Sequence, residues 1–291
     1  MKKKIRFTIN PRSGTREGNE LRALINNTID KNIFDFEIIP TRYAGHGVEL
    51  AAEAVKENYF AVVCAGGDGS VQEIARSTAG TSTALGIIPK GSGNGFARHL
   101  NIPMEAEKAL KIINNGKSMA VDVLKVNGKI CTNVFGIGFD GHIANLFSTM
   151  PKRGFITYAR LVIGRFNAFA PLQLQMTVDG KDMQCTSFLL TFANGSQFGN
   201  NATIAPQADM TDGMMEVCSI KKFPFAAAPS LIYLLMKKQI NKSRYYTMFR
   251  AKEIVIHLKH AVEAHLDGEP AVVDNEVKVE VVPKFLNVIA P

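Results

Sequence analysis

The sequence predicts an α/β domain with a mostly parallel sheet, followed by a second domain built mainly of β-strands. In the first third of the chain, short apolar strand-like runs alternate with segments of helical apolar periodicity, which is typical of a parallel sheet covered by helices. After about Val121 the pattern changes to short strands separated by turns such as Asn127-Gly128 and Asp179-Gly180. At 291 residues, two domains are favoured. We expect them to span residues 1–122 and 123–291.

In the first domain the expected elements follow in strict alternation. The apolar residues Val48, Ala51, Ala52 and Val55 keep a period of 3.6 and mark the buried face of one helix. The predicted strands span 5–9, 34–39, 60–63 and 84–88, and the first two helices span 18–30 and 48–58. This alternation predicts a parallel sheet covered by helices.

In the second domain the expected elements are strands rich in β-branched and aromatic residues. The predicted strands span 129–135, 172–178, 187–193, 215–220, 253–258 and 277–282. Neither an internal repeat nor a low-complexity linker interrupts them.

Two glycine-rich loops follow neighbouring strands of the first domain. The first runs from Gly66 to Ser70 ahead of a helix beginning near Val71, and the second runs from Pro89 to Gly95. Glycines let backbone N–H groups approach an anion, and a helix N-terminus adds its positive dipole end. A single glycine loop after a strand is more often a plain turn, but two such loops after neighbouring strands favour a phosphate site. Asp68, between two glycines, suits Mg²⁺ ligation or orientation of a hydroxyl beside a phosphate. No Walker A string occurs.

Five ordered motifs resemble the diacylglycerol kinase and sphingosine kinase superfamily over nearly the whole chain. They are Asn10-Pro11-Arg12-Ser13-Gly14, Thr41 with Gly45 and His46, Gly66 to Ser70, Gly91 to Asn94, and Leu266-Asp267-Gly268-Glu269-Pro270. The resemblance implies a fold like that of NAD kinase and diacylglycerol kinase, with a β-sandwich second domain and a last strand, 286–289, that returns to the first domain. It also implies a kinase that uses ATP and Mg²⁺ to phosphorylate a lipid hydroxyl, in a cleft between the domains.

The resemblance assigns a nucleotide site position by position. Ser70 and Ser92 stand where relatives often carry threonine and keep the hydroxyl, whereas Gly95 departs from the aspartate of many bacterial diacylglycerol kinases, which leaves diacylglycerol and sphingoid bases both open as acceptors. The residues assigned to ATP are Asn10, Pro11, Arg12, Ser13, Gly14, Thr41, Gly66, Gly67, Asp68, Gly69, Ser70, Val71, Gln72, Gly91, Ser92, Gly93 and Asn94.

Two carboxylates flank Gly268. Phosphorylation of an alcohol needs an acceptor for the hydroxyl proton, and a carboxylate near the γ-phosphate can serve. By resemblance Glu269 is that base, with Asp267 beside it in the catalytic set and Asp68 as the competing base or Mg²⁺ ligand. The alternative for Asp267-Gly268 is a simple hairpin turn.

The segment 205–214 resembles the structural Mg²⁺ loop of the same superfamily. There the Asp212 carboxylate would be the main ligand, with carbonyl oxygens of Asp209 and Met214, because hard cations prefer oxygen donors. An Asp-Gly turn without metal is the alternative.

A second glycine motif, Gly136-Ile137-Gly138-Phe139-Asp140-Gly141, matches the dinucleotide-binding pattern after a strand. The acidic residue expected about twenty positions later is missing, because no Asp or Glu occurs from 141 to 178. The sequence therefore argues against a dehydrogenase.

The positive charge is concentrated in the middle of the chain. Residues 141–260 carry 14 Lys and Arg against 6 Asp and Glu, in a chain of net charge +8. Without stacking motifs or a helix-turn-helix, this favours an anionic membrane surface over nucleic acid; a solvated helix face is the alternative. The apolar segment 225–236 has lysines at both ends and is too short to span a bilayer. It suits either a membrane surface or a buried helix.

The remaining sequence features concern the compartment. Four scattered cysteines without a C-x-x-C pair are typical of free thiols in a reducing compartment. The lysines at 2–4 precede only a short apolar run, so we expect a first strand there and not a signal peptide. We expect a cytoplasmic protein, transiently at the inner membrane surface, with a homodimer as a further option.

Two other functions stay open. An NAD kinase shares the Gly-Gly-Asp-Gly chemistry, although the loop 91–98 and the bend 266–270 fit lipid kinases better. A non-catalytic lipid- or nucleotide-binding regulator would be expected to lack Asp68 or Glu269, and both are present.

Overall fold

The computed structural model describes residues 2–10, 15–150 and 155–291. It divides into two compact units, the first formed by Met1–Val123 with Pro283–Pro291 and the second by Leu124–Val282. The division falls inside two strands, β5 (Ser118–Val126) and β16 (Glu276–Ile289). The end of the chain therefore belongs to the same unit as its beginning.

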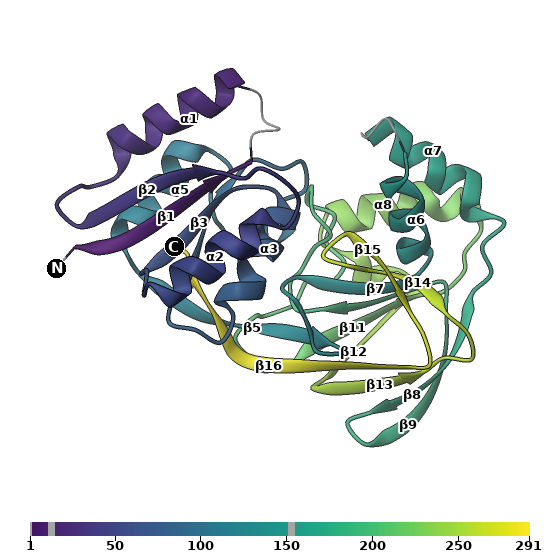
Figure 1. The fold of residues 1–291 in the computed structure, drawn as a ribbon. Helices are drawn as coiled ribbons and strands as arrows, with labels where there is room; N and C mark the ends of the chain where they lie inside the picture. The colour runs from purple at the N-terminus through teal and green to yellow at the C-terminus, as the bar shows by residue number, and fades with distance from the viewer. Residues whose placement is uncertain (1, 11–14, 151–154) are drawn as a thin grey trace. The chain divides into compact units, whose positions relative to one another are not determined.

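The first unit is built on a parallel sheet with the strand order β2-β1-β3-β4 (Figure 1). Phe7 of β1 lies opposite Ile38 of β2 on one side and Val63 of β3 on the other. Val288 of β16 pairs in parallel with Leu85 of β4, so the last strand extends this sheet. The bounds are β1 (Lys3–Ile9), β2 (Phe34–Pro40), β3 (Ala61–Gly66) and β4 (Ala84–Pro89).

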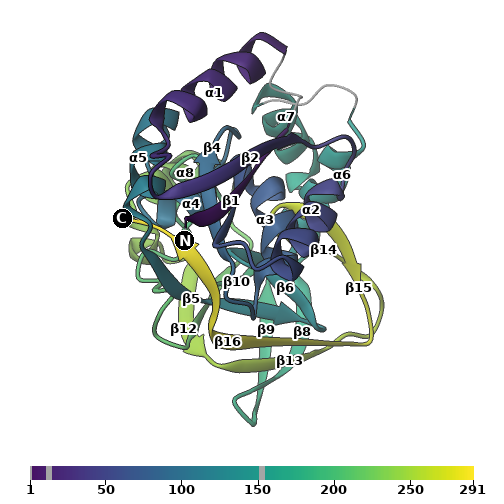
Figure 2. The ribbon, with the colours of Figure 1, turned by 60° about the vertical axis from the view of Figure 1, so that its left-hand side comes forward.

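Helices cover both faces of this sheet (Figure 2). They are α1 (Thr15–Thr28), α2 (His46–Lys56), α3 (Asp68–Thr78), α4 (Gly95–His99) and α5 (Ala106–Asn115). Ile5 and Phe7 pack in one core with Ile25 of α1 and Leu110 of α5. Side chains alternate along a strand, so Arg6 points to the other face, where its guanidinium donates to the Leu50 carbonyl of α2 at 2.8 Å.

Arg6 is a buried cation that links β1, β2 and α2. Its Nε donates to Glu37 Oε1 at 2.6 Å, and an Nη1 donates to Glu53 Oε2 at 3.2 Å. Tyr59 donates its hydroxyl to the same Glu37 oxygen at 2.8 Å. Burial by itself would raise the pKa of the Glu37 carboxyl, but the hydrogen bonds from Arg6 and Tyr59 outweigh it and lower the pKa.

The second unit is a sandwich of two sheets. One is antiparallel with the order β12-β11-β10-β7-β14-β15. The other contains β13, β8 and β9 beside the first part of β16, which also pairs with β5, and β5 pairs with β6. The bounds are β6 (Lys129–Cys131), β7 (Val134–Gly138), β8 (Leu172–Val178), β9 (Lys181–Ser187), β10 (Leu189–Ala193), β11 (Met215–Ile220), β12 (Tyr246–Ala251), β13 (Glu253–His257), β14 (Val262–Leu266) and β15 (Glu269–Val273).

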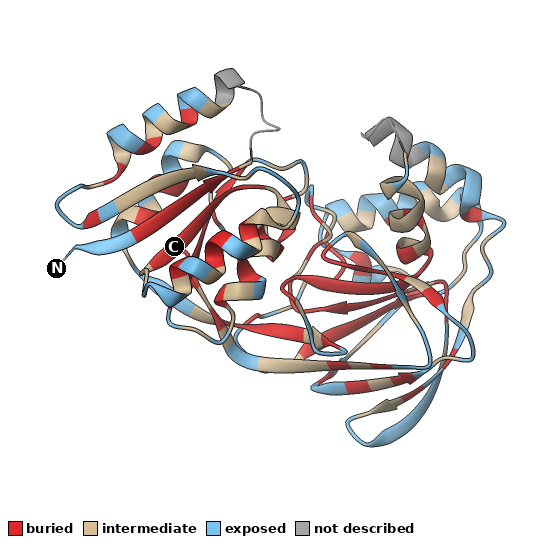
Figure 3. Cartoon of the chain, viewed as in Figure 1, coloured by how far each residue is buried: buried red, intermediate tan, exposed pale blue. Residues whose placement is uncertain are grey.

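Apolar side chains of both sheets meet in one core. Phe135 of β7 stacks on Phe192 of β10, with ring centroids 5.5 Å apart, and both belong to a cluster with Met176 of β8 and Ile256 of β13. Figure 3 shows β7 and β11 as buried, whereas the tip of the β8–β9 hairpin is exposed. The helices of this unit are α6 (Phe139–Ser148), α7 (Phe155–Phe166), η2 (Phe225–Ala227), α8 (Ala228–Met236) and η3 (Ile240–Lys242).

The predicted fold class, a mostly parallel α/β domain with a β-sandwich domain, is confirmed. One expected strand differs. The run 129–135 is divided into β6 and β7, because the backbone N–H groups of Thr132, Asn133 and Val134 donate to the Asp267 carboxylate. Among the described residues no helix has the length and apolar character needed to cross a membrane.

The Arg6 network predicts a pH-dependent stability. Because the folded pKa of Glu37 is lowered, its contribution is present above the unfolded pKa and is lost as the pH falls through the folded pKa. Glu37 is partly exposed, so we expect Glu37→Gln to lower the free energy of unfolding at pH 7 by only about 1 kcal/mol. Urea unfolding across pH 3–7 checks this. A difference from wild type that persists at the acid end would contradict it, and Asp35→Asn on the exposed side of β2 is the control.

Candidate active site

The predicted nucleotide-binding segments follow strands of the first unit at one edge of its parallel sheet. The backbone N–H of Asn10 donates to the Ala65 carbonyl at 3.3 Å, and that of Thr41 donates to Ile9 at 2.9 Å. The Lys90 N–H donates to Gly66 at 2.8 Å. The chain beyond all four strands is thus gathered at the carboxyl edge, where open α/β sheets bind ligands. The predicted residues Pro11, Arg12, Ser13 and Gly14 lie outside the described residues.

The two glycine loops pack directly against each other. A Cβ placed on Gly91 would lie 2.5 Å from the Gly67 Cα, and one on Gly67 would lie 3.0 Å from the Gly91 Cα. Asn94, in a left-handed conformation with φ 52°, accepts from the Gly91 N–H at 3.1 Å and donates to the Gly91 carbonyl at 2.7 Å. Glycine is therefore required here for the close approach of two backbones.

Asp68 connects the first loop to the helix after the second. It begins α3, with Gly67 at the N-cap, and its Oδ1 accepts the Phe96 N–H of α4 at 3.4 Å. Gly69 and Ser70 are half-buried in the same first turn of α3, where backbone N–H groups have no intrahelical acceptor. This turn offers amide donors and a carboxylate side by side.

The other predicted residues of these loops differ in their exposure. Ser92 is exposed, and Gly93 is half-buried. Val71 and Gln72 are buried, and the Gln72 Oε1 accepts from Arg76 at 3.0 Å. Any contribution of these two residues to a phosphate site would therefore come through the backbone.

Glu73 is a site-organising residue that sequence reasoning missed. Its two carboxylate oxygens accept the N–H groups of Gly45 at 2.9 Å and Gly47 at 3.0 Å. These bonds tie the start of α2, and with it the segment after Thr41, to the glycine-loop helix α3. A Cβ on Gly47 would lie 2.4 Å from the Glu73 carboxylate. Gly47 is therefore the residue in the sequence that could have indicated this close contact.

In the second unit the predicted carboxylates lie at the hairpin between β14 and β15. Asp267 and Gly268 have φ values of 51° and 84°, as a tight hairpin turn requires. The buried Asp267 carboxylate accepts from the N–H groups of Thr132, Asn133 and Val134 at 2.8, 2.8 and 3.0 Å. It also accepts from the Thr132 hydroxyl at 2.9 Å and the Cys131 thiol at 3.2 Å.

Asp267 and Glu269 therefore have different surroundings. Both Asp267 oxygens are engaged in holding the segment between β6 and β7, which leaves little capacity to accept a substrate proton. Glu269 begins β15 and is half-buried. Of the two, Glu269 has the better placement for a base, and Asp267 anchors the turn that carries it.

A buried histidine and aspartate brace the other side of this turn. The Gly268 N–H donates to His265 Nδ1 at 3.3 Å, so Nδ1 is an acceptor and Nε2 carries the proton. That proton points to Asp140 Oδ2 at 3.2 Å, which also accepts from the Thr191 hydroxyl at 3.3 Å. Neither residue is among the predicted site residues, although His265 directly precedes the Leu266–Pro270 motif.

The glycine motif at 136–141 allows this close packing. A Cβ on Gly136 would lie 2.4 Å from His265 Nε2 and 2.3 Å from Asp140 Oδ2. A Cβ on Gly141 would lie 2.4 Å from the Glu263 carbonyl of β14. The glycines thus admit the buried pair and let α6 lie against the hairpin strand.

The carboxylates of the predicted metal loop already have hydrogen-bond and ion-pair partners within the protein. Asp209 Oδ1 accepts the Thr211 N–H at 2.9 Å, Asp212 Oδ1 accepts the Met214 N–H at 2.9 Å, and Asp212 Oδ2 pairs with Arg250. Within the described ranges no group of three or more His, Cys, Asp or Glu is placed to hold a metal ion. A cation would have to displace Arg250 from Asp212, so this donor set does not fit one as folded, and ligation by Asp209, Asp212 and Met214 stays a prediction.

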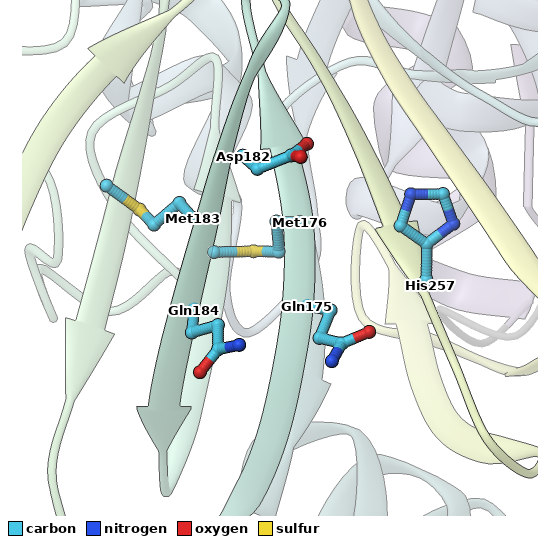
Figure 4. Close-up of a pocket in the computed structure, with 6 residues that line it drawn as sticks. All are labelled: Gln175, Met176, Asp182, Met183, Gln184 and His257. Carbon is cyan, nitrogen blue, oxygen red and sulfur yellow. The ribbon is translucent and has the colours of Figure 1, made fainter.

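A surface pocket lies elsewhere in the second unit, on β8, β9 and β13 (Figure 4). His257, Gln175 and Gln184 are paired neighbours across these three strands. The other lining residues are Met176, Asp182 and Met183. None of the predicted site residues lines it.

Comparison with known families covers almost the whole chain. Residues 4–126 match the diacylglycerol kinase catalytic domain, and residues 133–290 match the YegS C-terminal NAD kinase beta sandwich-like domain. The chain belongs to the diacylglycerol kinase/YegS-like lipid kinase family. This membership favours a lipid kinase over the NAD kinase and dehydrogenase alternatives.

Individual family members are similar at low identity over most of their length. A diacylglycerol kinase of Bacillus subtilis (strain 168) is 26% identical over 92% of this chain and 90% of its own. A "Probable lipid kinase YegS-like" of Chromohalobacter salexigens is 28% identical over 85% of this chain and 81% of its own. A crystal structure of a diacylglycerol kinase from Bacillus anthracis str. Sterne shares the fold, with a TM-score of 0.75, 22% identity and coverage of 99% and 97% of the two chains.

The Asp267 geometry predicts a large effect of a nearly isosteric change. Asp267→Asn places an amide donor where N–H donors already converge, so we expect the free energy of unfolding to fall by about 3 kcal/mol. Thermal and urea unfolding measure it. The control is Asp274→Asn, at an exposed position just after β15. Equal stability of the two variants would show that Asp267 is not the anchor of the turn.

Proposed function

We propose that this lipid kinase family member transfers the γ-phosphoryl group of ATP to the hydroxyl of a lipid, with diacylglycerol or a sphingoid base as acceptor. The observation that carries the proposal is the close packing of two glycine loops at the carboxyl edge of the parallel sheet, with Asp68 between them. Backbone amides at such loops and at a helix N-terminus are suited to phosphate oxygens. Asn10, Thr41, Gly66–Gln72 and Gly91–Asn94 are the proposed ATP contacts, and residues 11–14, which lie outside the described residues, are part of the same prediction.

Each carboxylate has a separate proposed role. Glu269 accepts the proton of the lipid hydroxyl while that oxygen bonds to the γ-phosphorus and ADP leaves. Asp267 acts through Glu269, because it positions the turn. Asp68 would hold Mg²⁺, an ion that proteins usually bind through one or two carboxylates together with substrate phosphates. When bound, Mg²⁺ would neutralise the charge that develops on the phosphates.

The acceptor also bears on where the protein works. We propose a cytoplasmic protein that reaches its lipid at the inner face of a membrane. The supports are the lipid kinase family and the four unpaired thiols, of which Cys64, Cys131 and Cys218 are buried.

The experiment that tests the function is transfer from labelled ATP to a panel of acceptors in mixed micelles. The panel contains diacylglycerol, a sphingoid base, phosphatidylglycerol and NAD. We expect a labelled lipid with Mg²⁺ and none with EDTA, restored by excess Mg²⁺. Label on NAD alone would instead favour the NAD kinase alternative, and label on no acceptor would favour a binding protein.

Substitution of the two proposed reactive carboxylates should abolish turnover without unfolding the chain. We expect Glu269→Gln to lower kcat by about 10²–10⁴, as loss of a general base does, and Asp68→Asn by about 10²–10³, as loss of charge stabilisation does. Glu276→Gln and Asp35→Asn remove exposed carboxylates of the same units and serve as controls. If a variant retains the wild-type kcat, the substituted residue does not have the role proposed for it.

A further inference from the structure

The helical segment formed by η2 and α8 is apolar on two faces, only one of which is buried. Leu231 is 5% exposed, and with Leu234 and Leu235 it packs into the core cluster that contains Ile220 and Tyr246. Phe225, Ile232, Tyr233 and Met236 are 44%, 59%, 59% and 48% exposed. A helix at a protein surface normally carries polar residues on its outer side.

The exposed apolar residues lie along one stripe. Within α8, the exposed residues Pro229, Ile232, Tyr233 and Met236 have the spacing i, i+3, i+4 and i+7. Residues with this spacing share one face of a helix. Large apolar side chains grouped in this way mark an interaction surface.

The stretch of chain that carries this stripe has charged residues of one sign only. From Val217 to Lys252 the chain contains no Asp or Glu. The same stretch contains eight cationic residues, namely Lys221, Lys222, Lys237, Lys238, Lys242, Arg244, Arg250 and Lys252. All of them except Lys222 are exposed. Lys221 comes shortly before the helical segment, and Lys237 and Lys238 follow it directly, so exposed cations stand at both ends of the apolar stripe. Arg250, further along the chain, pairs with Asp212.

Lys222 shows that this basic stretch joins the other acid-free stretch of the chain, 141–178. Its ammonium donates to the carbonyl oxygens of Phe166 and Phe169 and lies 4.3 Å from the Phe166 ring centroid. The Phe166 ring also contacts the Phe225 ring, with centroids 5.4 Å apart. η2 therefore packs against the end of α7, where Ile163 and Arg165 are also exposed.

We infer that the η2–α8 face docks onto the surface of an anionic phospholipid bilayer, with its apolar stripe among the acyl chains and its cations at the headgroups. A polar face rich in lysine beside exposed large apolar residues is what interfacial binding requires. A second copy of this chain fits poorly, because two such faces would place their cations against each other. The inference rests on the proposed function only in that a lipid acceptor has to be reached at a membrane.

The test is co-sedimentation with vesicles of phosphatidylcholine alone or mixed with phosphatidylglycerol, without nucleotide. We expect binding only to the mixed vesicles, and weaker binding as salt is raised. Ile232→Asn with Met236→Asn should lower the partition coefficient at least tenfold, whereas Ile33→Asn, at a site 44% exposed in the first unit, should not change it. Thermal unfolding of each variant confirms that it folds.

A charge variant provides a second, independent arm. Lys237→Gln with Lys242→Gln should weaken binding about fivefold per lysine, whereas Lys108→Gln with Lys111→Gln changes the net charge equally on α5 and should have little effect. Wild-type protein that does not bind anionic vesicles, or binding unchanged in both the Ile232/Met236 and the Lys237/Lys242 variants, would overturn the inference. So would a wild-type dimer in sedimentation velocity that the Ile232 and Met236 substitutions dissociate.

Kinase assays separate this inference from the proposed function. The Ile232/Met236 and Lys237/Lys242 variants should lose activity on acceptor in vesicles but keep it on a short-chain acceptor in solution. Vesicle binding by Glu269→Gln, which should not turn over, shows docking without catalysis. If no acceptor is phosphorylated but vesicle binding follows the predicted pattern, the proposed function fails and the docking surface stands.

Discussion

The carboxylate of Asp267 determines the local structure of the candidate catalytic turn. A buried charge is tolerated only when hydrogen bonds replace its hydration, and here three backbone N–H groups, a hydroxyl and a thiol do so. These bonds interrupt the strand between β6 and β7 and fix the β14–β15 turn against the residues that connect these two strands. Since Glu269 is only two residues further on, its position follows from the same interaction, and His265 with Asp140 supports the turn from its other side.

The first unit uses the same chemistry at its sheet edge. There Glu73 accepts the N–H groups that begin α2, and Asp68 accepts the N–H of Phe96. In each case a carboxylate orders backbone amides that no strand or helix satisfies. Gly67 and Gly91 then allow the two loops to approach within a distance that excludes any side chain. A phosphate site built from main-chain donors needs this order, because flexible donors would lose entropy on binding.

The η2–α8 face follows a different physical principle. Its exposed isoleucine, tyrosine and methionine have no core to fill, and the surrounding cations find no acidic residue in the same stretch of chain. Exposed apolar side chains are unfavourable in water, and clustered cations repel one another. An anionic lipid surface relieves both, because the bilayer offers an apolar interior and negatively charged headgroups together. The opposite face of α8 packs in a core, as an ordinary buried helix does. The segment 225–236 therefore combines a buried face with the exposed face that we infer docks on a membrane, the two interpretations that its sequence left open.

The sequence by itself determined the fold class, the alternation of strands and helices in the first domain, and the two glycine loops, because apolar periodicity and glycine spacing are local properties. It also marked Glu269 and Asp68 through short motifs. It could not separate the roles of Asp267 and Glu269, or find Glu73, His265 and Asp140, because their partners lie far along the chain: Asp267 bonds to residues more than 130 positions away. Only the tertiary structure decided that the glycine motif at 136–141 allows close packing of α6 and the buried His265, and that α8 leaves one apolar face exposed. Both depend on residues that long-range folding brings into contact.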